Sequence, residues 1–326
     1  SSFIGEHTVS AMMLPVALAI IRNSGQQVNR SSNLSTLLLF SIAYGCAMGS
    51  IGTPSGGGRN AIMIGYLSEF GLANISYVDW MKHTFPILVI EIPIAALILW
   101  FTFTPKQKSL DSAIRKIKVE VANEGKLSDN QWISIFIFLF IFFCWVFLSP
   151  LLGLGIIALF GVFLYLSFGL IDWKEISGST NWGVILLFGS AISLGIQMKE
   201  TGAAFWVAET AISNLEYVFK DLFIVRWFIS VMFTGLLTNL ISSAATVAVL
   251  GPIVLDMGGD PIIMGIATSI ASSFSYLTLV ASPTCMIIYS TGIISSRDYL
   301  KAGWKLFLIS NIILIVVSYF YWPLLI

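Results

Sequence analysis

Long apolar runs alternate with short ones along most of the chain. A helix needs about 20 apolar residues to cross a bilayer. The runs that reach or approach this length are Phe85–Phe103, Trp132–Leu148, Leu152–Ile171, Leu306–Tyr321, Leu34–Gly49, Leu222–Leu240 and Pro261–Ala281. The pattern therefore predicts a polytopic helical membrane protein in which each of these runs forms a spanning helix.

The shorter apolar segments are interrupted by Gly, Pro, Ser and Thr. They are Val9–Ile21, Asn60–Phe70, Ala244–Leu255 and Pro283–Ile294. Each is too short to span alone, so we expect half-helices or arms of re-entrant hairpins. Irregular backbone at membrane depth is tolerated only where protein or a watery cavity satisfies it. The short segments thus predict broken helices around an internal site.

Composition agrees with the hydropathy pattern. The chain has 326 residues, of which 57% are hydrophobic and 10% charged, and its mean hydropathy is +0.89. Soluble domains carry about 25% charged residues, so a lipid bilayer is the expected surroundings. The formal net charge is zero, which gives no electrostatic footprint for nucleic acid. The three cysteines lie in apolar surroundings and predict neither a disulfide nor a metal site.

One basic segment divides the chain into two halves. Residues 105–130 carry lysines and an arginine, with apolar residues at helical spacing. This pattern predicts an amphipathic helix on the cytoplasmic surface, or equally a solvated linker. We expect a first repeat over 1–104 and a second over 131–326. Phe205–Asp221 predicts a second interfacial helix.

Three landmarks recur in the same order in the two halves. The run from Ala11 to Pro15 matches the one from Val247 to Pro252. The other pairs are Gly52-Thr53-Pro54 with Ala281-Ser282-Pro283, and Asp79 to Lys82 with Asp298 to Lys301. Weak internal symmetry of this kind is typical of transporters built from inverted repeats. The first half begins at its landmark, so we expect further helices upstream of it.

A polar cluster interrupts the apolar pattern in the second half, and we call this interruption the second break. Ser242, Ser243 and Thr246 follow a spanning run, and Thr238 and Asn239 lie just upstream. Hydroxyls and unwound carbonyls there could coordinate sodium, and the N–H groups of the next helix start could hold an anion. The alternative is ordinary Ser/Thr packing between membrane helices.

The first half has two such interruptions, a charged one at Glu6 and His7 and a glycine-rich one from Gly52 to Asn60. We call them together the first break. A carboxylate at membrane depth costs free energy and therefore suggests a function. Glu6 could ligate a cation, or it could carry a proton with His7 beside it. The alternative is a surface position for Glu6. The stretch from Gly52 to Asn60 holds three consecutive glycines and Arg59, which together predict an anion nest with Glu6 as the candidate partner of Arg59. Alternatively, Arg59 caps a surface loop.

Other chemistry has little support in the sequence. Glu91 interrupts a spanning run and is a weak candidate to face the bundle. The sequence contains no Ser-His-Asp order, HExxH motif or paired catalytic carboxylates, so we expect no enzyme.

These breaks resemble those of the divalent anion/sodium symporter family, which carries dicarboxylates, citrate or sulfate. The family's hairpin tips bear Ser-Asn-Thr, then an Ala/Thr-rich run and a proline. Here Ser10 to Pro15 matches the first run, and Pro252 has the family spacing after the second tip. The family's Gly-Thr-Pro-Pro-Asn segment corresponds to Gly52-Thr53-Pro54 with a glycine-rich insertion before Asn60. The resemblance covers almost the whole chain.

The resemblance implies an all-α elevator-type homodimer with inverted repeats, re-entrant hairpins and broken helices, in the cell membrane (the inner membrane of a bacterium). It implies a sodium ion near each tip. Carried over by position, the first ion has Ser1, Gly5, Glu6 and Gly52, and the second has Thr238, Ile241, Ser243 and Ala281. Candidate contacts of a small anionic substrate are Glu6, His7, Thr53, Arg59, Asn60, Ser242, Ser243, Ala244 and Ser282.

Two departures from the family pattern change this expectation. Glu6 replaces an amide, and Ala244 lacks the family's hydroxyl. Either Arg59 offsets Glu6 or the substrate is not a simple dicarboxylate, and a proton could replace sodium at the first site. We therefore expect a sodium-coupled carrier of a small anion. The alternatives are a proton-coupled or exchange carrier, or a non-transporting membrane subunit that keeps the fold.

Overall fold

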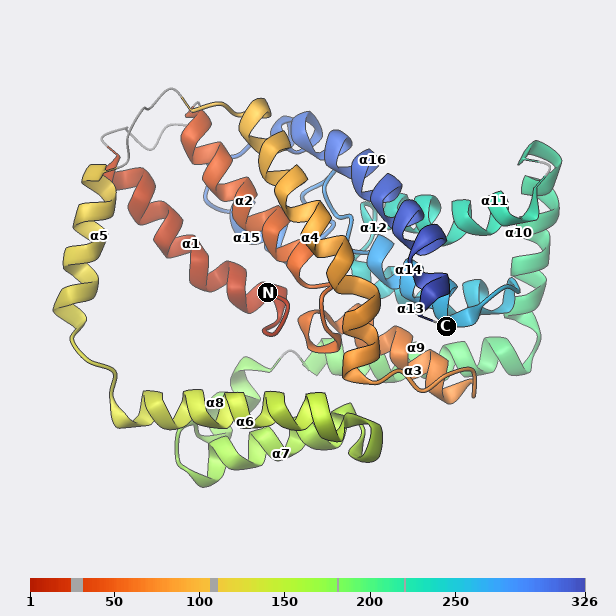
Figure 1. Cartoon of the computed structure of the whole chain (residues 1–326), viewed down its shortest axis with the longest axis horizontal. Helices are drawn as coiled ribbons and strands as arrows, with labels where there is room; N and C mark the ends of the chain where they lie inside the picture. The colour runs from red at the N-terminus through yellow and green to blue at the C-terminus, as the bar shows by residue number, and fades with distance from the viewer. Residues whose placement is uncertain (25–31, 106–110, 181, 220, 326) are drawn as a thin grey trace.

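The computed structural model describes residues 1–24, 32–105, 111–180, 182–219 and 221–325, and within these ranges it is helical with no strand (Figure 1). Its helices are α1 (Glu6–Asn23), α2 (Asn33–Gly49), α3 (Gly58–Glu69), α4 (Tyr77–Thr102), α5 (Asp111–Glu124), α6 (Asp129–Leu152), α7 (Leu154–Ser167), α8 (Trp173–Ser179), α9 (Trp182–Glu200), α10 (Ala203–Phe219), α11 (Leu222–Trp227), α12 (Thr234–Thr238), α13 (Ser243–Asp256), α14 (Pro261–Ala271), α15 (Pro283–Tyr289) and α16 (Ser296–Phe320). A π-helical segment, Phe228–Phe233, joins α11 to α12.

Three described helices are long and apolar enough to cross a membrane. They are α4 with 26 residues, α6 with 24, and α16 with the turn after it, Ser296–Leu324, with 29. Most of the α4 and α6 surface is not covered by protein, and large apolar side chains such as Val89 and Phe136 point outward. An apolar outer surface of this kind suits lipid rather than water.

The short segments contain helices, as predicted. The segment beginning at Val9 lies in α1, which is longer than predicted because it starts at Glu6. The segments Asn60–Phe70 and Ala244–Leu255 correspond closely to α3 and α13. The last one, Pro283–Ile294, forms only the short helix α15.

Two predicted spanning helices were wrong in extent. The run Leu152–Ile171 gives only α7, which has 14 residues. The run Pro261–Ala281 is helical only in α14, because the chain leaves the helix at Ser272. Serine hydroxyls compete with the backbone for hydrogen bonds, and here Ser272 and Ser273 donate to the carbonyls of Ser269 and Ile270. Residues 272–282 are instead irregular and mostly buried.

The main core lies where α2, α4, α14 and α16 meet, with the irregular residues 272–282 among them (Figure 1). Helix α4 packs along α16, and α2 packs against α4. Across the two halves, α1 packs against α15 and α13 packs against α3. The first half-helix of each half therefore contacts the second half-helix of the other half.

Helices α5 to α7 lie at the periphery. In Figure 1, α5 runs down one side of the molecule, and α6 and α7 form a hairpin along the lower edge. The hairpin has a small core of its own, made by Ile137, Ile141, Cys144 and Ile157. The described part of the predicted linker is α5, on which Arg115, Lys116 and Lys118 are exposed. Residues 106–110 of that linker lie outside the described residues.

Candidate functional site

The first break contains a buried ion pair. Glu6 is the first residue of α1, and Arg59 lies in the first turn of α3. Arg59 Nη1 lies 3.4 Å from Glu6 Oε1, with Arg59 2% and Glu6 5% exposed. Arg59 Nη2 also donates to Ser50 Oγ and, at 3.5 Å, to the Ala47 carbonyl. The predicted partnership of Arg59 with Glu6 is confirmed, and Arg59 is not a surface cap.

The glycine-rich loop accommodates the backbone before α1. Thr53 Oγ1 donates to the Ser2 carbonyl, and Ser2 Oγ donates to the Gly49 carbonyl at 2.7 Å. A Cβ atom on Gly56 would lie 2.4 Å from the Ser50 carbonyl oxygen and 2.9 Å from that of Ser2. Only glycine fits this close approach of two backbone segments. The insertion therefore has a structural role in joining the tip to the loop.

Asn60 connects the first break to the second half. Its Nδ2 donates to the carbonyls of Ser50 and Thr53, at 2.9 and 2.8 Å. Its Oδ1 accepts from Ser269 Oγ on α14 at 3.0 Å. Because both ends of this amide bind protein groups, Asn60 fixes the loop in this structure rather than presenting a free amide to a substrate.

The second break is built around Asn239. Asn239 Nδ2 donates to the Phe274 carbonyl at 2.9 Å, and its Oδ1 accepts from the Leu277 N–H at 2.8 Å. Thr278 Oγ1 donates to the Asn239 carbonyl, and Thr238 Oγ1 donates to the Ser272 carbonyl at 2.7 Å. Asn239 thus satisfies backbone groups that the unwound residues 272–282 leave without helical partners.

Helix caps account for several of the predicted substrate contacts. Ser242 Oγ accepts from the Ala245 N–H at the start of α13, and Ser282 Oγ accepts from the Thr284 N–H at the start of α15. Ser243 is buried, whereas Ala244 is half-buried against α3 residues. His7 is exposed and lies 4.0 Å from Glu6 Oε1. Thr53 is fully buried.

The residues predicted to ligate the two cations differ in whether their oxygen atoms already form hydrogen bonds within the protein. Ser1 Oγ donates to the Cys46 carbonyl, and the Gly52 carbonyl accepts from Thr84 Oγ1. At the second break, Ala281 is fully buried and Ile241 is 37% exposed. The remaining members of the two sets are Gly5, Glu6, Thr238 and Ser243, of which Glu6 pairs with Arg59 as described. Within the described ranges, no three His, Cys, Asp or Glu side chains form a metal cluster.

Two helix N-termini meet at the first break, and the first turn of α13 packs in an apolar cluster with α3. The first turns of α1 and α3 are joined by the Glu6–Arg59 pair. Ala244, in the first turn of α13, packs in the cluster that contains Ile62 and Met63 of α3. Helix N-termini expose N–H groups and a partial positive charge, which favours anions. The arrangement suits a small anion better than a cation or an apolar ligand.

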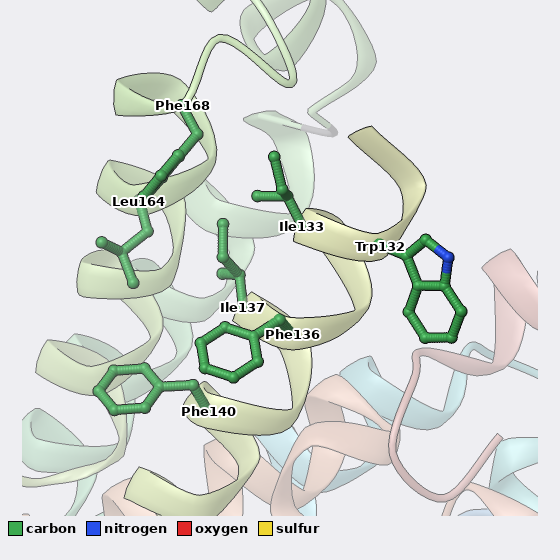
Figure 2. A pocket seen from close by; sticks show the side chains of 7 residues that line it. All are labelled: Trp132, Ile133, Phe136, Ile137, Phe140, Leu164 and Phe168. Atoms are coloured by element: carbon green, nitrogen blue, oxygen red, sulfur yellow. The ribbon is translucent and has the colours of Figure 1, made fainter. Parts of the chain in front are cut away.

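A cavity of about 640 Å³ lies away from both breaks. Figure 2 shows its apolar lining side chains on α6 and α7. Those side chains are Trp132, Ile133, Phe136, Ile137, Phe140, Leu164 and Phe168. A groove of this chemistry suits acyl chains and gives no hydrogen-bond donor aimed at an anion. It is therefore not the anion site.

Sequence reasoning missed part of this site. Ser50 and Ser269 bind Arg59 and Asn60, and the unwound residues 272–278 surround Asn239. The serine cluster at 272–275 was a signal for the unwound stretch, because serines favour breaks over helix interiors. Nothing in the local sequence singles out Ser50 or Ser269.

Comparison with known proteins identifies a family of membrane transporters. Residues 5–326 match the family model described as the sodium:sulfate symporter transmembrane region. An uncharacterized transporter of Haemophilus influenzae is 26% identical over 99% of this chain and 70% of its own length. An uncharacterized transporter of Methanocaldococcus jannaschii is 28% identical over 98% of this chain and 71% of its own length.

A sodium-dependent dicarboxylate transporter of Staphylococcus saprophyticus is also similar. It is 26% identical over 99% of this chain and 67% of its own length. The proteins matched here are transporters and not enzymes, and they are integral to membranes, which agrees with the apolar helices of this chain. Since the family model covers nearly every residue, this chain belongs to the sodium:sulfate symporter transmembrane-region family.

Proposed function

We propose that this chain is the core of a secondary transporter that moves a small dianion, such as sulfate or a dicarboxylate, together with sodium ions. The observation that carries the proposal is the meeting of the α1 and α3 N-termini at a buried arginine, with the first turn of α13 packed in the apolar cluster that contains Ile62 and Met63 of α3. Glu6 cancels the charge of Arg59, so the backbone N–H groups and helix dipoles supply the attraction for the anion. The anion would lie between the start of α1 and the start of α13.

The coupling ion is proposed from the relatives and from the second break. The names of related proteins specify sodium-dependent transport of dicarboxylates. Carbonyl and hydroxyl oxygens gather where Thr238 and Asn239 meet Ser272 and Thr278, and hard cations prefer such oxygens. At the first break, Arg59 already supplies a positive charge beside Glu6. We therefore propose that sodium binds chiefly at the second break, and no observation favours a proton at the first.

Architecture at the level of the whole transporter is also a proposal. The reciprocal packing of α1 on α15 and of α13 on α3 is what a pseudo-two-fold relation between 1–104 and 131–326 would produce. The hydrogen bonds agree, because Ser1 and Ser2 bind the end of α2 as Thr238 and Asn239 bind the end of α14. We propose an elevator-type homodimer in the cell membrane, with 105–130 as the linker.

The direct test is uptake into liposomes. The full protein is reconstituted, and entry of radiolabelled sulfate and succinate is measured with and without an inward sodium gradient. We expect uptake of at least one of the two anions to be stimulated by the gradient and abolished by Arg59→Gln. Uptake of neither anion under any gradient would contradict the proposal.

Liposomes preloaded with unlabelled anion distinguish symport from anion exchange. Exchange requires internal anion and no sodium, whereas symport requires external sodium and no internal anion.

A further inference from the structure

A second buried carboxyl group lies away from the two breaks, in the middle of α4. Glu91 is 1% exposed and is flanked by Pro86 and Pro93 on the same helix. Its Oε1 accepts hydrogen bonds from Ser310 Oγ on α16 and from Tyr276 Oη, the latter at 3.2 Å. Its Oε2 is buried and has no hydrogen-bond partner. The carboxyl group is therefore half satisfied.

No counter-ion reaches Glu91 within the described part of the chain. The ion pairs found there are Arg59 with Glu6, Lys82 with Asp79 and, if protonated, His7 with Glu6. Among the described residues, no ion pair joins Glu91 to the other ionisable groups on the elements around it. They are His83 and Asp79 on α4, Tyr44 and Cys46 on α2, Asp129 and Cys144 on α6, Cys285 on α15, and Arg297, Asp298, Tyr299, Lys301 and Lys305 on α16.

The nearest of these groups do not neutralise the carboxyl. Lys305 Nζ contacts Thr102 near the far end of α4. Tyr44 donates to the Tyr276 carbonyl, and Tyr299 donates to the Cys285 carbonyl. Arg59 interacts electrostatically with the Tyr276 hydroxyl, but its ion-pair partner is Glu6. An ionised Glu91 would be a buried charge without a partner, which is costly at membrane depth.

We propose that Glu91, Tyr276 and Ser310 form a proton-binding site, in which Glu91 Oε2 takes up a proton from hydronium, leaving water, and returns it to water when the carboxyl group ionises. A proton suits this site better than a metal ion. A hard cation needs several oxygen ligands, and within the described ranges the Glu91 carboxyl gathers two hydroxyls and no second acid.

The site is positioned to influence the second break. Tyr276 belongs to the unwound residues 272–282, whose Leu277 N–H binds Asn239 and whose Thr278 hydroxyl binds the Asn239 carbonyl. Ionisation of Glu91 would change the hydrogen bond from Tyr276 and hence the position of this segment. Loading of the proton site is thereby linked to the geometry of the second break. This link, unlike protonation itself, rests on the proposed transport function.

Infrared difference spectroscopy tests protonation without any transport assay. The full protein in lipid is titrated from acidic to alkaline pH, and the C=O stretch of protonated carboxylic acids is followed for the wild type and for Glu91→Gln. We expect a band that persists at neutral pH in the wild type and is lost in Glu91→Gln. The band should return at a shifted frequency in Glu91→Asp. It should be unchanged in the control Glu200→Gln, which alters an exposed residue. Identical wild-type and Glu91→Gln spectra throughout the titration would overturn the proposal.

Uptake of sulfate, which stays a dianion across this pH range, tests the link to transport. In liposomes at equal sodium on both sides, an inward proton gradient should accelerate wild-type uptake. The same gradient should not change the rate of Glu91→Gln uptake relative to that variant's own rate without the gradient. Equal acceleration of both proteins would refute the link. Absence of both sulfate and succinate uptake by the wild type would refute the proposed function instead, and the infrared result would still stand.

Discussion

At the scale of single residues, the buried pair of Glu6 and Arg59 determines the charge of the first break. Both side chains are almost fully buried, and Nη1 and Oε1 are 3.4 Å apart. Removing one member of a buried pair leaves an uncompensated charge, which costs about 3 to 5 kcal/mol, whereas removing both is often tolerated. The pair thus contributes to both folding and the electrostatics of the site.

The first prediction concerns this pair. Arg59→Gln should lower the thermal unfolding temperature of the detergent-solubilised protein markedly, because Glu6 loses its partner. The double variant Glu6→Gln with Arg59→Gln should recover most of the lost stability. Arg297→Gln, which alters an exposed arginine, is the control and should unfold like the wild type. An Arg59→Gln protein as stable as the wild type would show that the pair is energetically unimportant.

At the scale of elements, the unwound residues 272–282 connect most of the polar features described above. They bind Asn239 through backbone groups, contact Glu91 through Tyr276, and pass closely beneath α16. A Cβ atom on Gly303 of α16 would lie 2.1 Å from the Tyr276 carbonyl oxygen. Helix α16 can pack against this segment only because position 303 has no side chain.

The second prediction follows from that contact. In an open helix interior, a Gly→Ala substitution stabilises a protein by about 1 kcal/mol. Gly303→Ala should instead destabilise the protein and reduce anion uptake, because the new methyl group would clash with the Tyr276 carbonyl. Gly155→Ala on α7, where a Cβ would have nothing within 4 Å, is the matched control. A Gly303→Ala protein that is as stable and active as Gly155→Ala would contradict the packing described here.

Sequence reasoning recovered the breaks better than the contacts between them. The starts of α3 and α13 and the pairing of Arg59 with Glu6 could be predicted, because a buried arginine needs an acid and few acids exist here. The unwinding after Ala271 was missed, since mean hydropathy hides a serine cluster inside an apolar run. The contacts of Asn239 and Glu91 join residues far apart in the chain, and local patterns carry no information about such pairs.

At the scale of the whole molecule, α6 and α7 form a hairpin at the edge of the molecule (Figure 1), and Phe142 of α6 packs against Phe3, which precedes α1. The hairpin has a small core of its own, and α6 packs against α4. An elevator mechanism requires one rigid body to slide past another. A hairpin with its own core is a suitable part of the stationary body.

The third prediction is therefore a change in distance between these parts. Spin labels at Thr8→Cys on α1 and Phe163→Cys on α7, both exposed positions, are introduced after the three buried native cysteines are replaced. Sodium with sulfate or succinate should shift the distance distribution between the labels. A label pair within the hairpin, Ser134→Cys with Phe163→Cys, should not change. One fixed distance for the first pair under all conditions would contradict an elevator.

The central claim is that a small anion lies between the starts of α1, α3 and α13. It is tested most directly by a crystal structure with selenate or 2-bromosuccinate, whose heavy atoms are located by anomalous scattering. We predict a single strong peak within hydrogen-bond reach of the first turns of α1 and α13 and beside Arg59. A peak located only elsewhere, for example in the groove between α6 and α7, would contradict this account.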